Sequence, residues 1–353
     1  MTPGQPKNIP RGLARWLRCT RQSILWLGSI GLLACSGASV QSGTADRLDP
    51  ETEIAPFVSE LVARHGFEAE QLERILGGVR LRPEILEAMS RPAESLSWYQ
   101  YRPIFVTETR IARGEEFWRA HAGTLAQASR EFGVSPEIIV AIIGVETFYG
   151  TRKGKHLVLD SLATLAFRYP RRSKFFRTEL EQFLLLAQQE NFDTPKVKGS
   201  YAGAMGIPQF ISSSYRRYAV DFDCDGVRDL LSSESDAIGS VANYLKKHGW
   251  QRDGTVALPA SVSGDKYKTL VKKGIKPKTP VSDMDDFGVV VLYASGNKSP
   301  GALIELKNKT DTEYWVGLQN FYSITRYNHS SLYAMAVFQL AREISKRYRG
   351  AEG

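Results

Sequence analysis

Residues 135–150 carry an acidic side chain at a position suited to chemistry on a sugar–sugar bond. Ser135 can cap a helix, Pro136 suits the first helical position, and Gly150 favours a helix end. Nearly every side chain between them is apolar, so we predict a helix that is buried on most sides. Glu146 lies near its C-terminal end, on the same face as isoleucines three, four and seven positions before it.

Burial of this helix would change the acidity of Glu146. A carboxylate that loses water favours its neutral form, and the partial negative charge at a helix C-terminus acts in the same direction, so we expect a raised pKa. A carboxylic acid that stays protonated near neutral pH can donate its proton to the oxygen of a glycosidic bond. In the alternative interpretation, Glu146 ends the helix and turns to solvent or pairs with Arg152.

A second motif, at residues 221–229, is typical of a calcium-binding loop. Its sequence Asp-Phe-Asp-Cys-Asp-Gly-Val-Arg-Asp has carboxylates and a backbone carbonyl at the ligand positions and a glycine at the turn. Carboxylates this close repel one another strongly without a cation. Ser232 stands where such loops usually have a glutamate. We predict a structural Ca²⁺, since a cage of oxygens leaves no open position for catalysis; its ligands would be Asp221, Asp223, Asp225, Val227 and Asp229.

Two further stretches are suited to lining a saccharide groove. Residues 199–210 contain three glycines and three other small residues, which let a backbone approach a ligand closely. Ser200 and Gln209 are the polar groups among them. Residues 97–103 are dense in aromatic rings that can stack on sugars, namely Trp98, Tyr99 and Tyr101. A tight turn and ordinary core packing are the alternatives for these two stretches.

Composition and spacing exclude several other functions. The chain carries 46 basic and 38 acidic residues, and removal of the five basic residues in 1–34 leaves 41 against 38, or +3. This balance gives no indication of nucleic-acid binding. The five histidines show no zinc-ligand spacing, and no G-x-S-x-G motif occurs. We therefore expect neither catalytic zinc nor an organic cofactor.

The N-terminal segment resembles the signal peptide of a bacterial lipoprotein. Residues 1–34 are basic and then apolar, and the apolar run is too short to span a bilayer. Leu32-Leu-Ala-Cys35 resembles a lipobox, in which Cys35 is lipidated and becomes the new N-terminus. Ser36 after it implies the periplasmic face of the outer membrane, with residues 35–50 as a flexible tether. An ordinary signal peptide cut near Ala34 is the alternative.

Cysteine use agrees with this processing. Cys19 would be lost with the signal peptide and Cys35 would be lipidated, so Cys224 alone remains as a thiol. The mature chain therefore forms no internal disulfide, and its stability must come from its core.

The rest of the chain divides into helical and strand-rich parts. Amphipathic stripes predict a helical domain over residues 51–130, joined by a C-terminal helix at about 331–353. Residues 131–254, together with about 319–330, form the core that carries Glu146 and the acidic loop. Short strand-like runs between turn residues predict a small β subdomain over 255–318. The expected fold class is α+β, mainly α.

Several of these motifs together resemble a known family. Residues 144–150, 199–210, 221–229, 236–244 and 325–330 are similar, in the same order, to motifs of the membrane-bound lytic murein transglycosylase B family. The resemblance covers most of residues 51–349. It implies a lysozyme-like catalytic core with an N-terminal helical domain and a small inserted β subdomain. It also implies cleavage of the β-1,4 bond between N-acetylmuramic acid and N-acetylglucosamine in peptidoglycan, in which the muramic acid C6 hydroxyl attacks and leaves a 1,6-anhydro end.

The resemblance also implies roles for individual residues. Glu146 would be the single acid/base, and Arg171 and Arg172 would face the peptide stem. Asp236 would join the calcium ligands, although the loop is one residue longer before it, and Phe175 stands where the family has a tyrosine. The remaining substrate-binding positions would be Tyr101, Ser200, Gln209, Phe210, Tyr244, Tyr327, Asn328 and Tyr333. The implied partners are peptidoglycan glycan strands, the membrane through the lipid anchor, and cell-wall synthases.

Three functions remain open at this point. A lytic transglycosylase needs only one carboxylic acid if the N-acetyl group of the substrate assists the reaction. A hydrolytic muramidase would use the same groove with water as the nucleophile. A non-catalytic peptidoglycan-binding lipoprotein would only connect the outer membrane to the cell wall.

Overall fold

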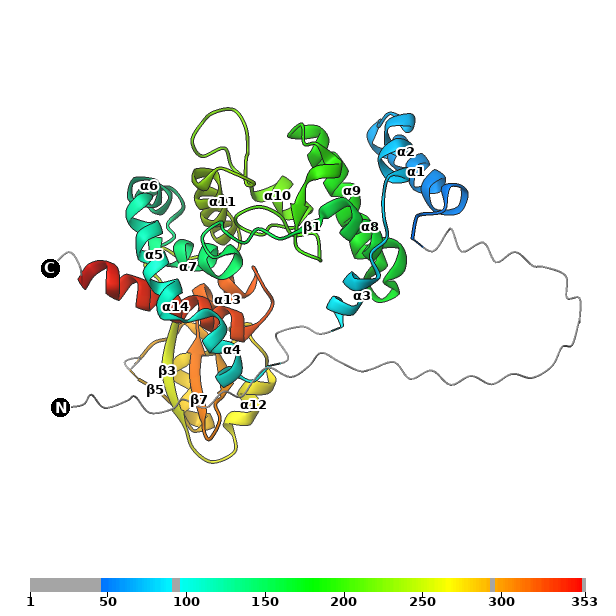
Figure 1. Ribbon diagram of the computed structural model, residues 1–353. Helices are drawn as coiled ribbons and strands as arrows, with labels where there is room; N and C mark the ends of the chain where they lie inside the picture. The colour runs from blue at the N-terminus through cyan, green and yellow to red at the C-terminus, as the bar shows by residue number, and fades with distance from the viewer. Residues whose placement is uncertain (1–45, 91–95, 293–295, 351–353) are drawn as a thin grey trace, which may run out of the picture. The chain divides into compact units, whose positions relative to one another are not determined.

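The structure is a computed structural model that describes residues 46–90, 96–292 and 296–350 (Figure 1). The predicted signal peptide, Cys35 and most of the predicted tether lie outside the described residues. Every described element belongs to the same unit of the chain, which extends from Gly43 to Gly353.

One group of helices joins the N-terminal part of the chain to its middle. Leu61, Leu76 and Ile85 share a hydrophobic cluster with Leu162 and Phe183. The elements of this group are η1 (Pro50–Ile54), α1 (Ala55–His65), α2 (Ala69–Gly77), α3 (Pro83–Met89), α8 (Val158–Arg168), η3 (Pro170–Arg172), α9 (Ser173–Gln189), η4 (Thr194–Lys196) and α10 (Ser212–Tyr218). The first helices of the predicted 51–130 domain therefore pack on the middle of the chain.

A second group surrounds the helix that carries Glu146. This helix, α7 (Pro136–Thr147), contacts four neighbours, α5, α6, α11 and α14 (Figure 1). All its residues from Ile138 to Val145 are buried, so the predicted burial on most sides is confirmed. The other helices of this group are α4 (Trp98–Phe105), α5 (Glu108–Ala120), α6 (Ala122–Phe132), α11 (Glu234–Lys247), α13 (Gln319–Thr325) and α14 (Ser331–Gly350).

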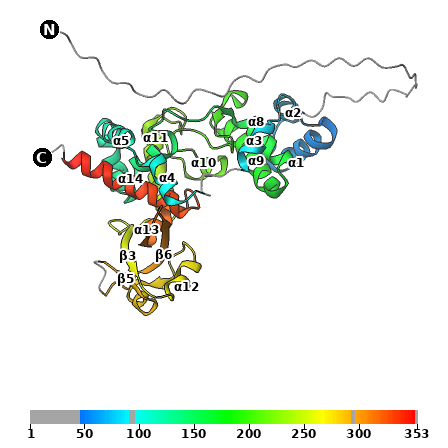
Figure 2. The ribbon, with the colours of Figure 1, turned by 60° about the horizontal axis from the view of Figure 1, so that its bottom comes forward.

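The strand-rich region, in which Figure 2 labels β3, β5 and β6, forms an antiparallel sheet with the strand order β4-β6-β7-β3-β5. The hairpin of β6 and β7 pairs Leu303 with Val316, and β3 lies on the other side of β7. The elements are β3 (Ala257–Val262), α12 (Tyr267–Lys272), β4 (Thr279–Pro280), η5 (Val281–Phe287), β5 (Val289–Val291), β6 (Pro300–Lys307) and β7 (Thr312–Gly317). Leu270, Met284 and Val289 bury a small core of their own with this sheet.

A two-stranded ladder completes the described structure. β1 (His156–Leu157) pairs with β2 (Lys198–Gly199), which brings the loop after α7 beside residues 199–210. The helices dominate and the sheets are small, so the predicted α+β, mainly α class is confirmed. Among the described residues, none of the helices is long and apolar enough to cross a bilayer.

Candidate active site

The C-terminal end of α7 adopts an unusual backbone just after Glu146. The helix stops at Thr147, three residues before the end that Gly150 predicts. Phe148, Tyr149 and Gly150 follow in the left-handed region, with φ of 51°, 60° and 78°. This conformation turns the Tyr149 ring back onto the helix, because a Cβ on Gly144 would lie only 2.6 Å from Tyr149 Cζ. Gly144 is therefore required by the close approach of Tyr149.

A buried arginine holds this helix end. Arg110 on α5 donates hydrogen bonds to the carbonyl of Gly144 (3.0 Å) and to those of Ile104 (2.6 Å) and Phe105 (3.0 Å). Its guanidinium also lies 5.2 Å from the ring centre of Phe148. Burial lowers the pKa of Arg110 from its ordinary value. The cation thus adds a second donor to the Gly144 carbonyl, which also accepts from the Phe148 amide at 3.2 Å. Sequence patterns gave no signal for this role.

Thr147 ties the same helix end to residues 199–210. Its hydroxyl donates to the Ile207 carbonyl at 2.8 Å and accepts from the Gly150 amide at 3.0 Å. Tyr149 is fixed in turn, since its hydroxyl donates to the Arg110 carbonyl at 2.7 Å. Neither residue was predicted to have a role, because both contacts join segments that are far apart in the sequence.

The Glu146 carboxylate receives a hydrogen bond from the opposite side of the site. Glu146 is half-buried, and its Oε1 accepts from the hydroxyl of Tyr333 on α14 at 2.6 Å. Burial, and then the negative charge of Glu146, raises the pKa of Tyr333 well above its usual range. The Tyr333 hydroxyl therefore keeps its proton and acts as a fixed donor.

Aromatic rings continue from Tyr333 away from Glu146. The ring of Tyr327 stacks at 6.4 Å from that of Tyr333 and lies 5.7 Å from Phe210 and 4.9 Å from Tyr244. Two hydroxyls in this group donate hydrogen bonds to the backbone. Tyr327 donates to the Pro208 carbonyl at 2.6 Å, and Tyr244 donates to the Arg326 carbonyl at 2.5 Å. Burial raises the pKa of Tyr244 and of Tyr327. The structure thus brings together Glu146 and four of the predicted groove residues.

The polar residues of 199–210 are held by the backbone around them. Ser200 Oγ accepts from the Ala204 amide at 3.0 Å, and Gln209 Nε2 donates to the carbonyls of Gly206 (2.8 Å) and Lys153 (3.2 Å). Gln209 itself has φ of 50°. Both side chains are half-buried, which leaves them accessible beside the aromatic group.

The other predicted groove residues lie in different surroundings. Tyr101 is only 1% exposed, and its ring packs 5.0 Å from that of Phe105, so protein covers it. Asn328 is half-buried and follows Tyr327 in the chain. Arg171 and Arg172 are exposed and line a separate pocket, in which the Arg172 guanidinium lies 4.2 Å from the ring centre of Phe175.

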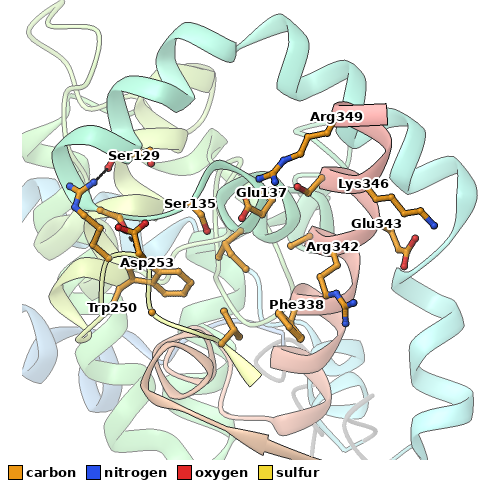
Figure 3. A pocket seen from close by; sticks show the side chains of 17 residues that line it. Ser129, Ser135, Glu137, Trp250, Asp253, Phe338, Arg342, Glu343, Lys346 and Arg349 are labelled. Atoms are coloured by element: carbon orange, nitrogen blue, oxygen red, sulfur yellow. Dashed lines mark hydrogen bonds between the residues drawn. The ribbon is translucent and has the colours of Figure 1, made fainter. Parts of the chain in front are cut away.

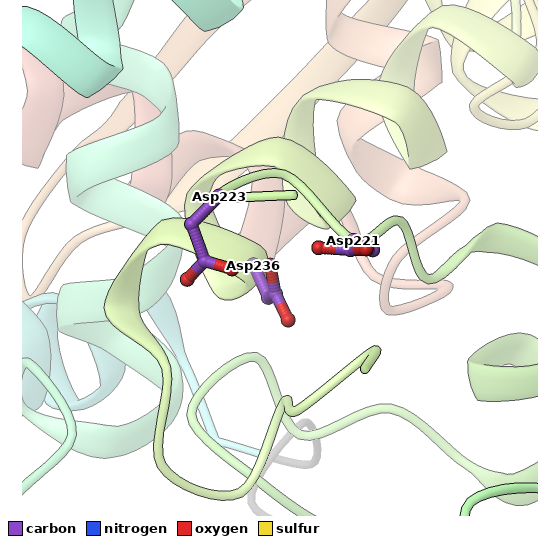
Figure 4. A group of neighbouring side chains, drawn as sticks. All are labelled: Asp221, Asp223 and Asp236. Carbon is purple, nitrogen blue, oxygen red and sulfur yellow. The ribbon is translucent and has the colours of Figure 1, made fainter. Parts of the chain in front are cut away.

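Three aspartates of the predicted calcium loop come together (Figure 4). One carboxylate oxygen each from Asp221, Asp223 and Asp236 lies within 4.8 Å of the other two. Asp236 belongs to the first turn of α11 and accepts from the amides of Phe222 and Asp229, both at 2.7 Å. Burial raises the pKa of Asp236, and the charge of Asp223 acts in the same direction. Carboxylates that converge in this way fit a hard cation.

The other predicted ligands point to backbone amides. Asp225 accepts from the amide of Val227 at 2.8 Å, and Asp229 accepts from those of Leu231 (2.8 Å) and Ser232 (2.9 Å). Neither belongs to the group of three converging carboxylates, and the Val227 side chain is exposed. Gly226 has φ of 93°, as the predicted turn requires.

Comparison with known proteins places this geometry in a family. A family model described as "Transglycosylase SLT domain" matches residues 49–342. Membrane-bound lytic murein transglycosylase B of Escherichia coli (strain K12) is 43% identical over 299 residues, which are 82% of this chain and 81% of that protein.

Two solved structures show the same similarity. The soluble lytic transglycosylase SltB1 from Pseudomonas aeruginosa is 48% identical, with a TM-score of 0.79 over 84% of this chain and 99% of that one. The Escherichia coli lytic transglycosylase Slt35 in complex with calcium is 42% identical, with a TM-score of 0.75 over 83% of this chain and 92% of that one. The chain therefore belongs to the family of proteins with a transglycosylase SLT domain.

Proposed function

We propose that this protein is a lytic murein transglycosylase that cleaves the MurNAc-β-1,4-GlcNAc bond of peptidoglycan and leaves 1,6-anhydromuramic acid ends. The relatives are named lytic murein transglycosylases, which supports the enzyme class. The observation that carries the mechanism is the half-buried Glu146 carboxylate, held by Tyr333 beside a group of aromatic rings.

Glu146 acts as both acid and base in this proposal. Its protonated form donates to the bridging oxygen as the glycosidic bond breaks, and the N-acetyl group of the substrate assists at the anomeric carbon. The resulting carboxylate then accepts the proton of the C6 hydroxyl as that oxygen closes the anhydro ring. Tyr333 fixes the direction of the carboxylate through both steps.

The surrounding residues bind and orient the glycan. Phe210, Tyr244, Tyr327 and Tyr333 form one aromatic group beside Glu146, and Ser200 and Gln209 supply polar contacts. Asn328 would add a polar contact, and Tyr101 would support the groove from a position that protein covers, while Arg171 and Arg172 would bind the carboxylates of the peptide stem as exposed cations.

Ca²⁺ has a structural role in this proposal. Asp221, Asp223 and Asp236 would hold it through the carboxylates that converge, and Asp225, Val227 and Asp229 would complete the set. The calcium complex of Slt35 supports a calcium site in this family. The bound cation would cancel the repulsion in the loop that leads into α11.

The proposed location is the periplasmic face of the outer membrane, with a lipid anchor at Cys35. The membrane-bound relative supports this location. The partners would then be the glycan strands of peptidoglycan and, through them, cell-wall synthases.

Digestion of purified sacculi by wild-type protein and Glu146→Gln tests the assigned acid. General acid–base catalysis contributes about 10²–10⁴-fold, so the variant should release soluble fragments at least about a hundredfold more slowly while still sedimenting with sacculi. Glu131→Gln, an exposed position on α6, is the matched control. Wild-type rates in Glu146→Gln would remove this residue as the acid, and a wild-type protein that releases nothing would favour the non-catalytic alternative.

A further inference from the structure

One pocket of the described structure, shown in Figure 3, lies at the N-terminal end of α7, whereas Glu146 lies near the C-terminal end of that helix. Its volume is about 650 Å³, and its walls come from the first turn of α7, residues 250–256 and the C-terminal half of α14. Glu137 lines it, and Glu146 lies nine positions further along the helix. At about 1.5 Å of rise per residue the two carboxylates are roughly 13 Å apart along the axis, so an occupant of this pocket leaves the glycan groove open.

An aromatic ring and an arginine in the pocket wall are held in place by hydrogen bonds. The Trp250 indole N–H donates to the Gly133 carbonyl at 3.0 Å, which fixes the ring. Phe338 of α14 lies on another wall (Figure 3). Arg252 is committed to the carbonyls of Ser129 (3.2 Å) and Arg130 (2.7 Å). Apolar surface for a ligand is therefore provided by side chains that cannot easily move.

Several other charged side chains that line the pocket form no ion pair with another described residue. Arg349 extends from α14 towards Glu137 across the pocket (Figure 3). Over the part of the chain that the structure describes, neither residue forms an ion pair within 4.0 Å, and neither does Asp253 on the wall of residues 250–256. Arg342 adds a second cation on the α14 side. Opposite charges thus line the same pocket without a direct ion pair between them.

This arrangement suits a ligand that carries both signs of charge. A carboxylate is recognised well by arginine, and an ammonium by the carboxylates of Glu137 and Asp253. We propose that the pocket binds a short peptide with a free ammonium and free carboxylates, and that its occupant is the peptide stem of peptidoglycan. The choice of this peptide rests on the proposed function. The pocket would be a second peptide site, distinct from Arg171 and Arg172, and would hold the enzyme on a neighbouring stem while the groove acts on a strand.

Isothermal titration calorimetry of the intact mature protein with the free pentapeptide stem, without its sugars, tests this proposal. Arg349→Glu and Glu137→Gln should each weaken the peptide's affinity at least about tenfold. Lys272→Glu, an exposed charge change on α12, should leave this binding step intact. The same peptide with its amino groups acetylated and its carboxylates amidated should not bind.

The proposal is overturned if the wild-type protein shows no heat of binding or if the blocked peptide binds equally well. It is also overturned if Arg171→Glu abolishes binding while Arg349→Glu does not. Digestion of sacculi by the same wild-type sample distinguishes the second peptide site from the enzymatic function. A protein that digests sacculi without binding the free peptide contradicts only the second peptide site, and one that binds the peptide without digesting sacculi contradicts only the enzymatic function.

Discussion

The hydroxyl of Tyr333 donates a hydrogen bond to Oε1 of Glu146 at 2.6 Å, although the two residues are 187 positions apart in the sequence. The contact joins the C-terminal end of α7 to the start of α14. It gives the carboxylate a defined direction, and it stabilises the charged form of the acid, because the donor is a neutral hydroxyl that burial keeps protonated.

Tyr333→Phe tests this contact. A hydrogen bond to a charged group contributes about 1.5–3 kcal/mol, so the rate at neutral pH should fall at least about tenfold. Tyr314→Phe, which loses a hydroxyl contact with Tyr267 on α12, is the control. An unchanged rate would show that Tyr333 does not act on the acid.

Gly144→Ala tests the packing that shapes the end of α7. The added Cβ would meet the Tyr149 ring at 2.6 Å, so we expect a loss of about 1–3 kcal/mol in the free energy of unfolding, as for other overpacked cores. Gly123→Ala on α6 is the matched control, because nothing lies within 4 Å of its Cβ position. That substitution should stabilise the protein by up to about 1 kcal/mol. Urea denaturation of both variants measures the difference, and equal midpoints would contradict the account.

Arg110→Met tests the buried cation. The change removes this donor from the carbonyls of Ile104 and Phe105, while the Gly144 carbonyl keeps the Phe148 amide, so the variant should lose about 1–3 kcal/mol of stability. Arg113→Met lies on the same helix, where the arginine is exposed and pairs only with Glu116 at 3.0 Å. It should cost less than about 1 kcal/mol. Thermal melts that rank the two variants equally would exclude a special role for Arg110.

Local patterns in the sequence predicted the start of α7 but not its end. Pro136 does open the helix, and Ser135 precedes it, although its side chain makes no capping hydrogen bond. The end comes three residues before Gly150, where Arg110 binds the Gly144 carbonyl and the Thr147 hydroxyl donates to the Ile207 carbonyl. A single-sequence pattern contains no information about such distant partners. A β subdomain was predicted over 255–318, where β3 to β7 lie, but the pairing order of its strands was not.

The candidate site depended even more on distant contacts. The convergence of Tyr333, Tyr327 and Phe210 near Glu146 was expected only from resemblance to a family, since nothing in their spacing indicates it. The aspartate motif predicted the position of the acidic loop. Its spacing did not reveal that Asp236 would converge with Asp221 and Asp223, while Asp225 and Asp229 would lie outside that group.

Removal of calcium should destabilise the protein. Three carboxylates lie within 4.8 Å of one another, so a chelator should restore their repulsion and lower the melting temperature. Calcium at about 100 times its dissociation constant should return about 2.7 kcal/mol of stability. Asp223→Asn should lose most of this calcium-dependent gain, and the exposed Asp311→Asn should keep it. A melting temperature that is equal with calcium and with chelator would contradict a structural calcium site.

The most direct test of the proposed reaction is the mass of its products when sacculi are digested in water enriched in heavy oxygen. We expect muropeptides that end in anhydromuramic acid, are lighter by one water than hydrolysis products and carry no label, because the C6 hydroxyl and not water attacks the anomeric carbon. Labelled reducing ends would show that water attacks, which would contradict the proposed mechanism and make the protein a hydrolytic muramidase.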